Sequence, residues 1–366
     1  MVCGGGSSPS SAPPRDETGD LLRTTWTAYV RSFIQGDGRV IDSRSGGNST
    51  SEGQAYAMLR AVWMDDRVVF DKALTWALNN LNHGVRPDNL WAWKWGRAAD
   101  GGYRVLDSAF ASDGDEDAAL ALIMAARTWN DDGYLRQARA ILVDLFERGT
   151  VVVNGRRFLL AGDGLCQRST CRLNPSYYAP YAYRVFARED PGHDWLSLVD
   201  TTYVLLARNS ALTATRLPSD WLLLDLGTGE LGLGSDTDSQ YSYDALRVPW
   251  RVHLDAILYA EPRAQTYLRD SLAWPAERFR QQQRLPASIS GAGDPRADFE
   301  APEMLAAMMP ALRAVAPDVA AAMDRRLQGT LADGFWAERD SYYLQNWVWF
   351  GTAVDRRSLA PFERVR

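Results

Sequence analysis

Three segments of the sequence place acidic side chains where they could perform acid–base chemistry. Glu52 lies in the stretch NSTSEGQAYAMLRAV, Asp113 begins the stretch DGDEDAALALIMAA, and Asp244 lies in YSYDALRVPWR. Two carboxyl groups can divide a hydrolytic reaction, because one donates a proton as general acid while the other activates water as general base. We therefore look for such a pair among these three residues.

Glu52 is the candidate for the acid, and the residues after it suit a ligand. Gly53 would allow close approach of a ligand, and Gln54 could donate hydrogen bonds to it. A general acid must keep its proton near neutral pH, so we expect burial or a neighbouring carboxylate to raise the pKa of Glu52. A helix start opposes this, because it favours the anion. The alternative is an ordinary helix cap formed by Ser51 and Glu52.

The other two acidic segments also have structural alternatives. The four acids between Asp113 and Asp117 could form a charged helix cap. The helix after them lacks the terminal Glu that a calcium loop needs. Arg247 follows Asp244 by three residues, so both would share a helical face, where the cation would suit an ionised base. The alternative is a plain ion pair on a helix surface.

The composition excludes some partners and favours another. There are 46 acidic and 40 basic residues, with no Lys/Arg run, which argues against nucleic acid. With 14 Trp and 15 Tyr, the chain has many flat apolar rings that suit sugar faces, although most of them should fill the core. Three Cys and three His, without CxxC or HExxH, predict no metal and no cofactor.

The first part of the chain has the composition of a flexible tether and lacks a hydrophobic signal core. Residues 1–20 are rich in Gly, Ser and Pro, which predicts a flexible tail before a single domain over residues 21–366. We expect a secreted or periplasmic protein whose signal was removed, with Cys3 as a candidate lipid-bearing residue; a cloning remnant is the alternative. No apolar run is long enough for a transmembrane segment. Cys166 and Cys171 could form a local disulfide or remain two free thiols.

The elements that must position these residues are mainly helices. Apolar residues at three- and four-residue spacing predict twelve helices. Twelve helices in one domain suggest six hairpins closed into an α/α barrel, although a solenoid has the same periodicity. A small β-hairpin with Asn154 and Gly155 at its turn is expected between helices. The predicted helices cover 21–35, 51–64, 66–82, 113–129, 131–148, 176–187, 191–212, 241–260, 262–280, 299–314, 317–327 and 341–353.

The even-numbered helices begin with polar or aromatic residues, which favours the barrel. If these helices form the inner ring and run in one direction, their first residues meet at one rim. A concave rim of carboxylates and aromatic rings is typical of a polysaccharide cleft. The six starts contain Ser51 to Gln54, Asp113 to Asp115, Ser176 to Tyr178, Tyr243 with Asp244, Phe299 with Glu300, and Tyr342 with Tyr343.

Residues 48–58, 111–129 and 241–250 resemble the three hallmark regions of family 8 glycoside hydrolases. The middle region, ASDGD followed by AALALIMAA and Trp129, follows that family's signature throughout. The resemblance extends from about residue 21 to the C-terminus and implies an (α/α)6 barrel with inverting hydrolysis. It also implies that Glu52 is the general acid, that Asp113 binds the sugar at the cleavage point, and that Asp244 is the base.

The resemblance extends to several candidate substrate-binding residues. Tyr243 and Arg247 occupy positions that resemble those fixing the base and its water. Trp93 and Tyr177 resemble sugar contacts, and we add Ser51 and Gln54 beside Glu52 as candidates. The final helix departs from the family pattern, since Trp347 and Trp349 look exposed.

The resemblance implies an endo-β-1,4-glucanase, similar to those that accompany bacterial cellulose synthesis. The expected partners are a β-1,4-glucan and the cellulose synthase machinery, and we expect a monomer. Asp244 makes the chitosanase-like branch less favoured, since that branch draws its base from another loop. The alternatives are a xylanase or chitosanase of the same family, a non-catalytic glucan guide, and a uronate lyase, which would want a cleft rich in Tyr/His or Arg.

Overall fold

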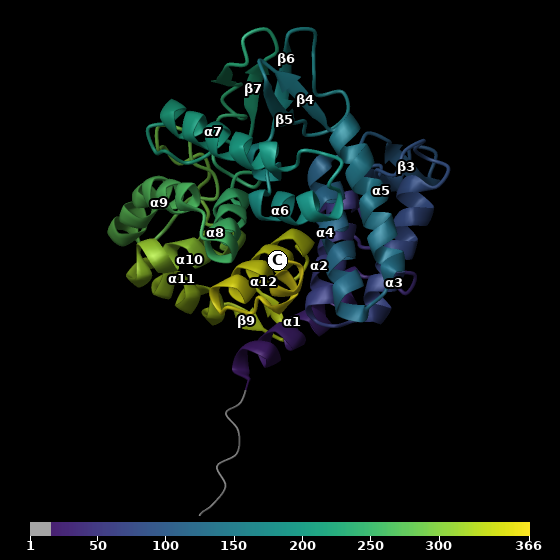
Figure 1. Cartoon of the computed structure of the whole chain (residues 1–366). Coiled ribbons are helices and arrows are strands. Elements are labelled where there is room, and N and C mark those ends of the chain that lie inside the picture. The colour runs from purple at the N-terminus through teal and green to yellow at the C-terminus, as the bar shows by residue number, and fades with distance from the viewer. Residues whose placement is uncertain (1–15) are drawn as a thin grey trace, which may run out of the picture.

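Two concentric rings of helices form the body of the molecule, as Figure 1 shows for this computed structural model, which describes residues 16–366. The twelve predicted helices are present, and their paired arrangement confirms the (α/α)6 barrel. The inner ring contains α2 (Ser51–Trp63), α4 (Ser112–Trp129), α6 (Pro180–Glu189), α8 (Arg247–Tyr259), α10 (Pro302–Val315) and α12 (Tyr342–Asp355). The outer ring contains α1 (Glu17–Phe33), α3 (Arg67–Ala77), α5 (Asp132–Arg148), α7 (Leu196–Leu212), α9 (Pro262–Gln282) and α11 (Pro317–Gly329).

Burial explains why the even helices form the inner ring. Every residue of α4 from Ser112 to Ala126 is buried, which requires neighbours on all sides. By contrast, α5 buries residues such as Leu135, Ala138 and Leu142 along one stripe. An all-round apolar helix can be covered only inside the barrel, so the polar residues at its first turn mark the barrel's accessible rim.

A short thirteenth helix that the sequence did not predict, α13 (Ala360–Val365), packs against α2 and α4. Its Phe362 contacts the ring of Trp63, the last residue of α2, at a centroid distance of 4.9 Å. Phe362 also lies edge-on to the rings of Tyr181 and Trp250 on the inner helices α6 and α8. This aromatic cluster fills the barrel at the C-terminal end of α2, away from the residues of its first turn.

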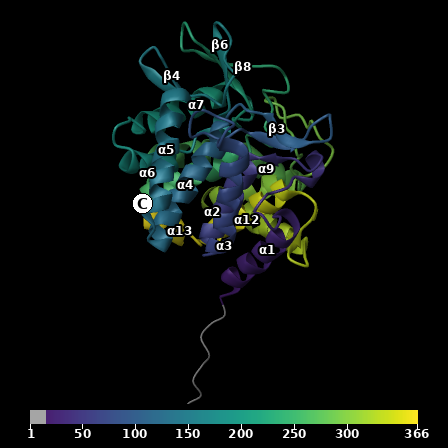
Figure 2. The ribbon, with the colours of Figure 1, turned by 90° about the vertical axis from the view of Figure 1, so that its right-hand side faces the viewer.

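Four small antiparallel sheets extend from the helices. The strands β4 to β7 lie at the top of Figure 1, and β3 lies on the right in Figure 2. The predicted hairpin is confirmed as β4 and β5, and its turn residues Asn154 and Gly155 have φ of 49° and 77°. The other three sheets were not predicted. The strands are β1 (Ser49–Thr50), β2 (Lys94–Arg97), β3 (Tyr103–Asp107), β4 (Thr150–Val153), β5 (Arg156–Leu159), β6 (Thr170–Leu173), β7 (Leu222–Asp225), β8 (Leu231–Leu233), β9 (Leu331–Ala332) and β10 (Phe335–Trp336).

Several predicted helix starts are wrong, and proline explains two of these errors. Helix α6 begins at Pro180 and α10 at Pro302, because proline fits the first turn, where its missing N–H is not needed. Tyr177 therefore lies in a 3₁₀ turn before α6. Helix α8 begins only at Arg247, which leaves Asp244 in the preceding turn.

The boundaries at the N-terminus also differ from the prediction. Helix α1 begins at Glu17, so residues 17–20 belong to the helix and not to the tail. The Asp16 side chain caps it by accepting a hydrogen bond from Gly19 N. Cys3 lies outside the described residues. Within residues 16–366, none of the helices has the length and apolar character needed to cross a membrane.

Candidate active site

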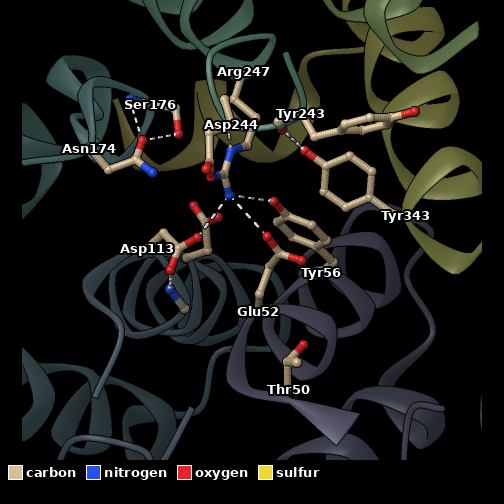
Figure 3. A network of polar contacts seen from close by, with 12 residues as sticks. Thr50, Glu52, Tyr56, Asp113, Asn174, Ser176, Tyr243, Asp244, Arg247 and Tyr343 are labelled. Carbon is tan, nitrogen blue, oxygen red and sulfur yellow. Dashed lines mark hydrogen bonds and ion pairs between the residues drawn. The ribbon is translucent and has the colours of Figure 1, made fainter. Parts of the chain in front are cut away.

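One buried guanidinium joins the three acidic segments that the sequence singled out. Arg247 Nη1 lies 2.9 Å from Glu52 Oε2 and 2.8 Å from Asp113 Oδ2. Its Nη2 lies 2.5 Å from Asp244 Oδ1. Figure 3 shows the three carboxyl groups pointing toward this cation, Glu52 and Asp113 from the first turns of α2 and α4 and Asp244 from the turn before α8. The structure therefore brings together all four residues that the sequence placed at the catalytic centre.

The first turns of the inner helices hold these side chains at the rim. Glu52 is the second residue of α2, whose start is fixed by the Thr50 hydroxyl accepting from Gly53 N at 3.0 Å. Asp113 is the second residue of α4 and accepts from Gly114 N at 2.9 Å. A Cβ on Gly114 would lie only 2.5 Å from the Ser51 hydroxyl, so glycine permits α2 and α4 to approach this closely.

The surroundings of Glu52 favour its protonated form at neutral pH. Burial raises its pKa to about 7, and the negative charges of Asp113 and Asp244 act in the same direction. The cation of Arg247 and a hydrogen bond from Tyr342 oppose the increase. The raised pKa agrees with the expectation from the sequence, and a carboxyl group with such a pKa can hold a proton near neutral pH.

Asp113 lies deeper in the barrel than the other two acids. Its side chain is 4% exposed, compared with 20% for Glu52 and 30% for Asp244. Burial raises its pKa, while the cations Arg247 and Arg251 lower it. Asp113 is therefore the most enclosed of the three acids, and the two more exposed acids, Glu52 and Asp244, line a cavity with Arg247.

The loop that carries Asp244 is fixed by two residues that the sequence analysis missed. Trp221 Nε1 donates to Asp244 Oδ2 at 3.1 Å, which leaves Asp244 held on both oxygens. The carboxylate of Asp220 accepts hydrogen bonds from Ser242 N at 3.0 Å and Ala245 N at 2.8 Å, on either side of Asp244. These residues come from the loop between α7 and β7, where Trp221 precedes Asp244 by 23 residues, and no periodic signal connects them with Asp244.

Two tyrosines complete the contacts around Glu52. Tyr342 donates to Glu52 Oε1 at 2.8 Å, and Tyr56 lies within 3.5 Å of Arg247 Nη1. Tyr342 belongs to an aromatic helix start that the sequence placed at the rim, but it was not named as a site residue. Tyr56 could have been found from its spacing, because it follows Glu52 by one helical turn.

Tyr243 and Tyr343 form one wall beside Asp244. The Tyr343 hydroxyl donates to the carbonyl of Tyr243 at 2.5 Å, and the two rings lie 6.3 Å apart. Figure 3 shows both rings on the same side of Arg247. Tyr243 is 43% exposed and lines a cavity of about 630 Å³ that also contains Glu52, Asp244 and Arg247. The catalytic cluster is therefore open to a ligand.

The two predicted sugar contacts lie next to the cluster. The ring of Tyr177 packs against the Arg247 guanidinium at 5.1 Å and against the Trp221 ring at 6.2 Å. The carbonyl of Trp93 accepts from Ser51 N at 3.1 Å, so Trp93 borders the first turn of α2. Both residues are partly exposed.

Ser51 and Gln54 point into the protein. Ser51 is 1% exposed and packs against Gly114 of α4. Gln54 is fully buried, and its amide donates to the carbonyls of Gly38 and Ala73 at 3.1 and 3.0 Å. The hydrogen-bonding atoms of Gln54 are thus occupied by the backbone, which gives this side chain a role in holding α2 in place.

Two further tryptophans of the last inner helix were predicted to be exposed, and this prediction is wrong. Trp347 and Trp349 are 1% and 0% exposed. Trp347 packs edge-on against Trp250 at 5.6 Å, and Trp349 donates to the carbonyl of Leu22 at 3.1 Å. They fill the core because α12 is an inner helix that is covered on all sides.

Cys166 and Cys171 are joined by a disulfide with an S–S distance of 2.03 Å, which settles the question that the sequence left open. The bond closes the loop that leads into β6. Within residues 16–366, no group of three or more His, Cys, Asp or Glu side chains is arranged to hold a metal ion.

Comparisons with known proteins agree with this geometry. A sequence model described as glycosyl hydrolases family 8 matches residues 17–271. An endoglucanase of Xanthomonas axonopodis pv. citri (strain 306) is 37% identical over 272 residues, which are 73% of this chain and 68% of that protein. An endoglucanase of Escherichia coli (strain K12) is 35% identical over 61% of this chain and 60% of its own length.

A solved structure has the same architecture. The crystal structure of an endo-1,4-D-glucanase from Vibrio fischeri ES114 superposes with a TM-score of 0.80 at 25% identity, covering 90% of this chain and 93% of the other. The matched segment contains the Arg247 cluster with its three acids. The chain therefore belongs to family 8 of the glycosyl hydrolases and is a glycoside hydrolase.

Proposed function

We propose that this protein is an inverting endo-β-1,4-glucanase. The observation that carries the proposal is the Arg247 cluster, in which a carboxyl group with a pKa of about 7 faces the same cation as a second carboxylate. The relatives named as endoglucanases support the choice of a β-1,4-glucan as substrate. The open cavity supports cleavage within a chain, because it is not closed at the catalytic residues.

Glu52 donates its proton to the oxygen of the leaving sugar. Its raised pKa keeps the proton available near neutral pH, and the Tyr342 hydrogen bond orients the carboxyl group. When the glycosidic bond breaks, Glu52 becomes an anion beside the Arg247 cation, which stabilises the new charge.

Asp244 accepts a proton from the water that attacks the anomeric carbon from the opposite face. Trp221 and Arg247 each hold one of its oxygens, so the carboxylate keeps a fixed direction. Inverting enzymes need room for this water and separate their carboxyl groups by roughly 6.5 to 9.5 Å, whereas retaining enzymes have about 5 Å. The separation between the carboxyl groups of Glu52 and Asp244 is therefore the geometric quantity that distinguishes the two mechanisms.

Asp113 binds the sugar at the cleavage point. Its contact with the same Arg247 guanidinium that binds Glu52 and Asp244 supports a contact with a hydroxyl of that sugar, and such contacts help to distort the ring toward the transition state. Trp93 and Tyr177 supply aromatic surface to neighbouring sugars, and Tyr243 and Arg247 position the base and its water.

We further propose that the protein acts outside the cytoplasm, in the periplasm or after secretion. The Cys166–Cys171 disulfide supports this, because such bonds persist in oxidising compartments. A partnership with the cellulose synthase machinery and a monomeric state stay predictions from the resemblance.

The experiment that tests the activity measures reducing ends released from carboxymethylcellulose, xylan and chitosan in parallel, with EDTA present. The Glu52→Gln variant is the matched control, because it keeps the shape of the side chain and removes only the acidic proton. We expect release and rapid viscosity loss on carboxymethylcellulose, and neither with the variant. Stronger release of reducing ends from xylan or chitosan would identify that polysaccharide as the substrate instead. No release from any of the three would favour a non-catalytic glucan guide.

A further inference from the structure

The catalytic cavity continues beyond Glu52 and Asp244 toward the start of α10. This extension is bordered by Phe299, by Glu303 in the first turn of α10, and by Glu338 from the loop before α12. Nothing in the mechanism described above uses these residues. The extension is therefore a part of the cleft whose ligand has still to be identified.

Glu303 is a buried carboxyl group with one oxygen that lacks a hydrogen bond within the described part of the chain. It is 5% exposed, and its Oε2 has no hydrogen-bond partner among residues 16–366. Two other acids along the same wall are paired, since Glu300 binds Arg326 at 2.7 Å and Glu338 binds Arg44. A buried polar atom without a partner costs free energy, so the position of Glu303 at the cavity points to a ligand that supplies one.

Two exposed rings lie at the same end of the cavity. Tyr243 is 43% exposed and Phe299 is 54% exposed, and both line the cavity with Glu303. Rings of this size offer flat apolar faces, which match the C–H faces of a sugar, while a carboxyl group matches its hydroxyls. The extension thus combines the two kinds of contact that a glycosyl unit needs.

The order of the inner helices shows which side of the cleavage point this is. The inner helices pack in ring order from α2 to α12, and α12 closes against α2. Helix α2, which carries Glu52, and helix α8, which follows the turn that carries Asp244, therefore face each other across the ring, as in Figure 1. Asp113 lies on one side of this line and Glu303 on the other. If Asp113 binds the sugar at the cleavage point, Glu303 lies on the side of the leaving sugar.

We propose that Glu303 binds a hydroxyl of the leaving-group sugar, with the rings of Tyr243 and Phe299 as apolar walls of that subsite. This inference rests on the proposed function, because it assumes that Asp113 marks the cleaved sugar. Burial and the negative charge of Glu338 raise the pKa of Glu303 to about 7. Both forms suit a hydroxyl, since the carboxyl group can donate to it and the carboxylate can accept from it.

The test compares two substrates that differ only on the leaving side. One is a cello-oligosaccharide long enough to fill both sides of the cleavage point, and the other is a β-cello-oligosaccharyl fluoride, whose leaving group is fluoride. We expect Glu303→Ala to lower kcat/KM for the oligosaccharide by about 10- to 100-fold, as for a lost hydrogen bond to a charged group. Hydrolysis of the fluoride should change by less than about twofold, because that substrate places no sugar near Glu303.

Two further variants separate sugar binding from folding. Glu303→Gln keeps hydrogen-bonding capacity and should lose less activity on the oligosaccharide than Glu303→Ala. Glu116→Gln is the matched control, because Glu116 is also a buried Glu without a hydrogen-bond partner for its carboxylate among residues 16–366, yet it does not line the cavity. It should leave the ratio between the two substrates unchanged. Thermal unfolding of each variant checks that the fold is intact.

An equal loss on both substrates, or no loss on either, would overturn the assignment of Glu303. The proposed function fails in a different way, because the unmodified protein would then hydrolyse neither the oligosaccharide nor the fluoride. A larger loss on the fluoride than on the oligosaccharide would place Glu303 on the opposite side of the cleavage point and would also contradict the proposal.

Discussion

Helices α4 and α8 contact each other through two arginine–carboxylate groups one turn apart, and only one of them lies at the cleft. At the rim, Arg247 contacts Glu52, Asp113 and Asp244 together. One turn deeper, Arg251 Nη1 and Nη2 bind the two oxygens of Asp117 at 3.0 and 2.8 Å. The two groups use the same residue types at the same spacing, but they differ in the number of acids for each cation.

The difference in the number of acids separates a structural pair from a reactive one. Asp117 and Arg251 satisfy each other through a bidentate contact and are 5% and 1% exposed. At Arg247 a single positive charge serves three acids, so one acid is favoured to keep its proton, and the pKa of Glu52 is about 7. An excess of acid over cation, together with an opening to solvent, is the arrangement from which we propose that the rim transfers protons.

The largest expected effects come from removing one carboxylate from each group. Asp244→Asn should lower kcat by about a hundredfold to ten-thousandfold, since general base catalysis contributes that much. Its unfolding temperature should stay near that of the unmodified protein, because Glu52 and Asp113 still contact the Arg247 guanidinium. Steady-state kinetics and calorimetry measure the two quantities.

Asp117→Asn is the matched variant in the deeper pair. It leaves the buried Arg251 without its anion, which should reduce the free energy of unfolding by about 3 to 5 kcal/mol. The activity per folded molecule should fall far less than in Asp244→Asn. If the Asp117 variant lost turnover without losing stability, the two groups would not differ as described.

A smaller effect is expected when the rim arginine is shortened to lysine. Arg247 reaches Glu52 and Asp113 through Nη1 and Asp244 through Nη2, and a single ammonium group lacks this fork. We expect Arg247→Lys to lower kcat/KM by about a hundredfold, as misplaced catalytic groups do. Activity within a few fold of the unmodified protein would show that the fork is not needed.

The smallest expected effects are shifts in the pH dependence. Glu52 must be protonated to act, so kcat/KM should fall as the pH rises through about 7. Asp113 raises the pKa of Glu52 and Tyr342 lowers it. The decline should therefore move about one unit to lower pH in Asp113→Asn and to higher pH in Tyr342→Phe. Shifts in the same direction would show that the decline does not report Glu52.

The grouping of Glu52, Asp113 and Asp244 around Arg247 could be predicted because each acid lies in a local motif at or just before a helix start. Glu52, Asp113 and the Asp244–Arg247 pair stand beside apolar helical runs, and the ring of even helices then brings them together. The raised pKa of Glu52 also followed from its expected surroundings. These predictions needed only the local sequence patterns and the assumption that the even-numbered helices form the inner ring and run in one direction.

The remaining site residues depend on contacts that have no local signal. Asp220 and Trp221 fix Asp244 from a separate loop, and Glu303 is distinguished only by a missing partner in three dimensions. Gln54 looked like a ligand contact beside Glu52, but its amide bonds to the backbone on the far side of α2. Sequence periodicity identifies the helix on which a residue lies, and the direction of a polar side chain at its end depends on tertiary packing.

The central claim is that Glu52 and Asp244 act on opposite faces of the sugar with a water between them. Proton NMR of the first products released from a β-1,4-linked cello-oligosaccharide tests this claim directly, because it distinguishes the anomers before they equilibrate. We predict that the α-anomer appears first and that the β-anomer grows only by mutarotation. Initial release of the β-anomer would contradict inversion and the roles assigned to both residues.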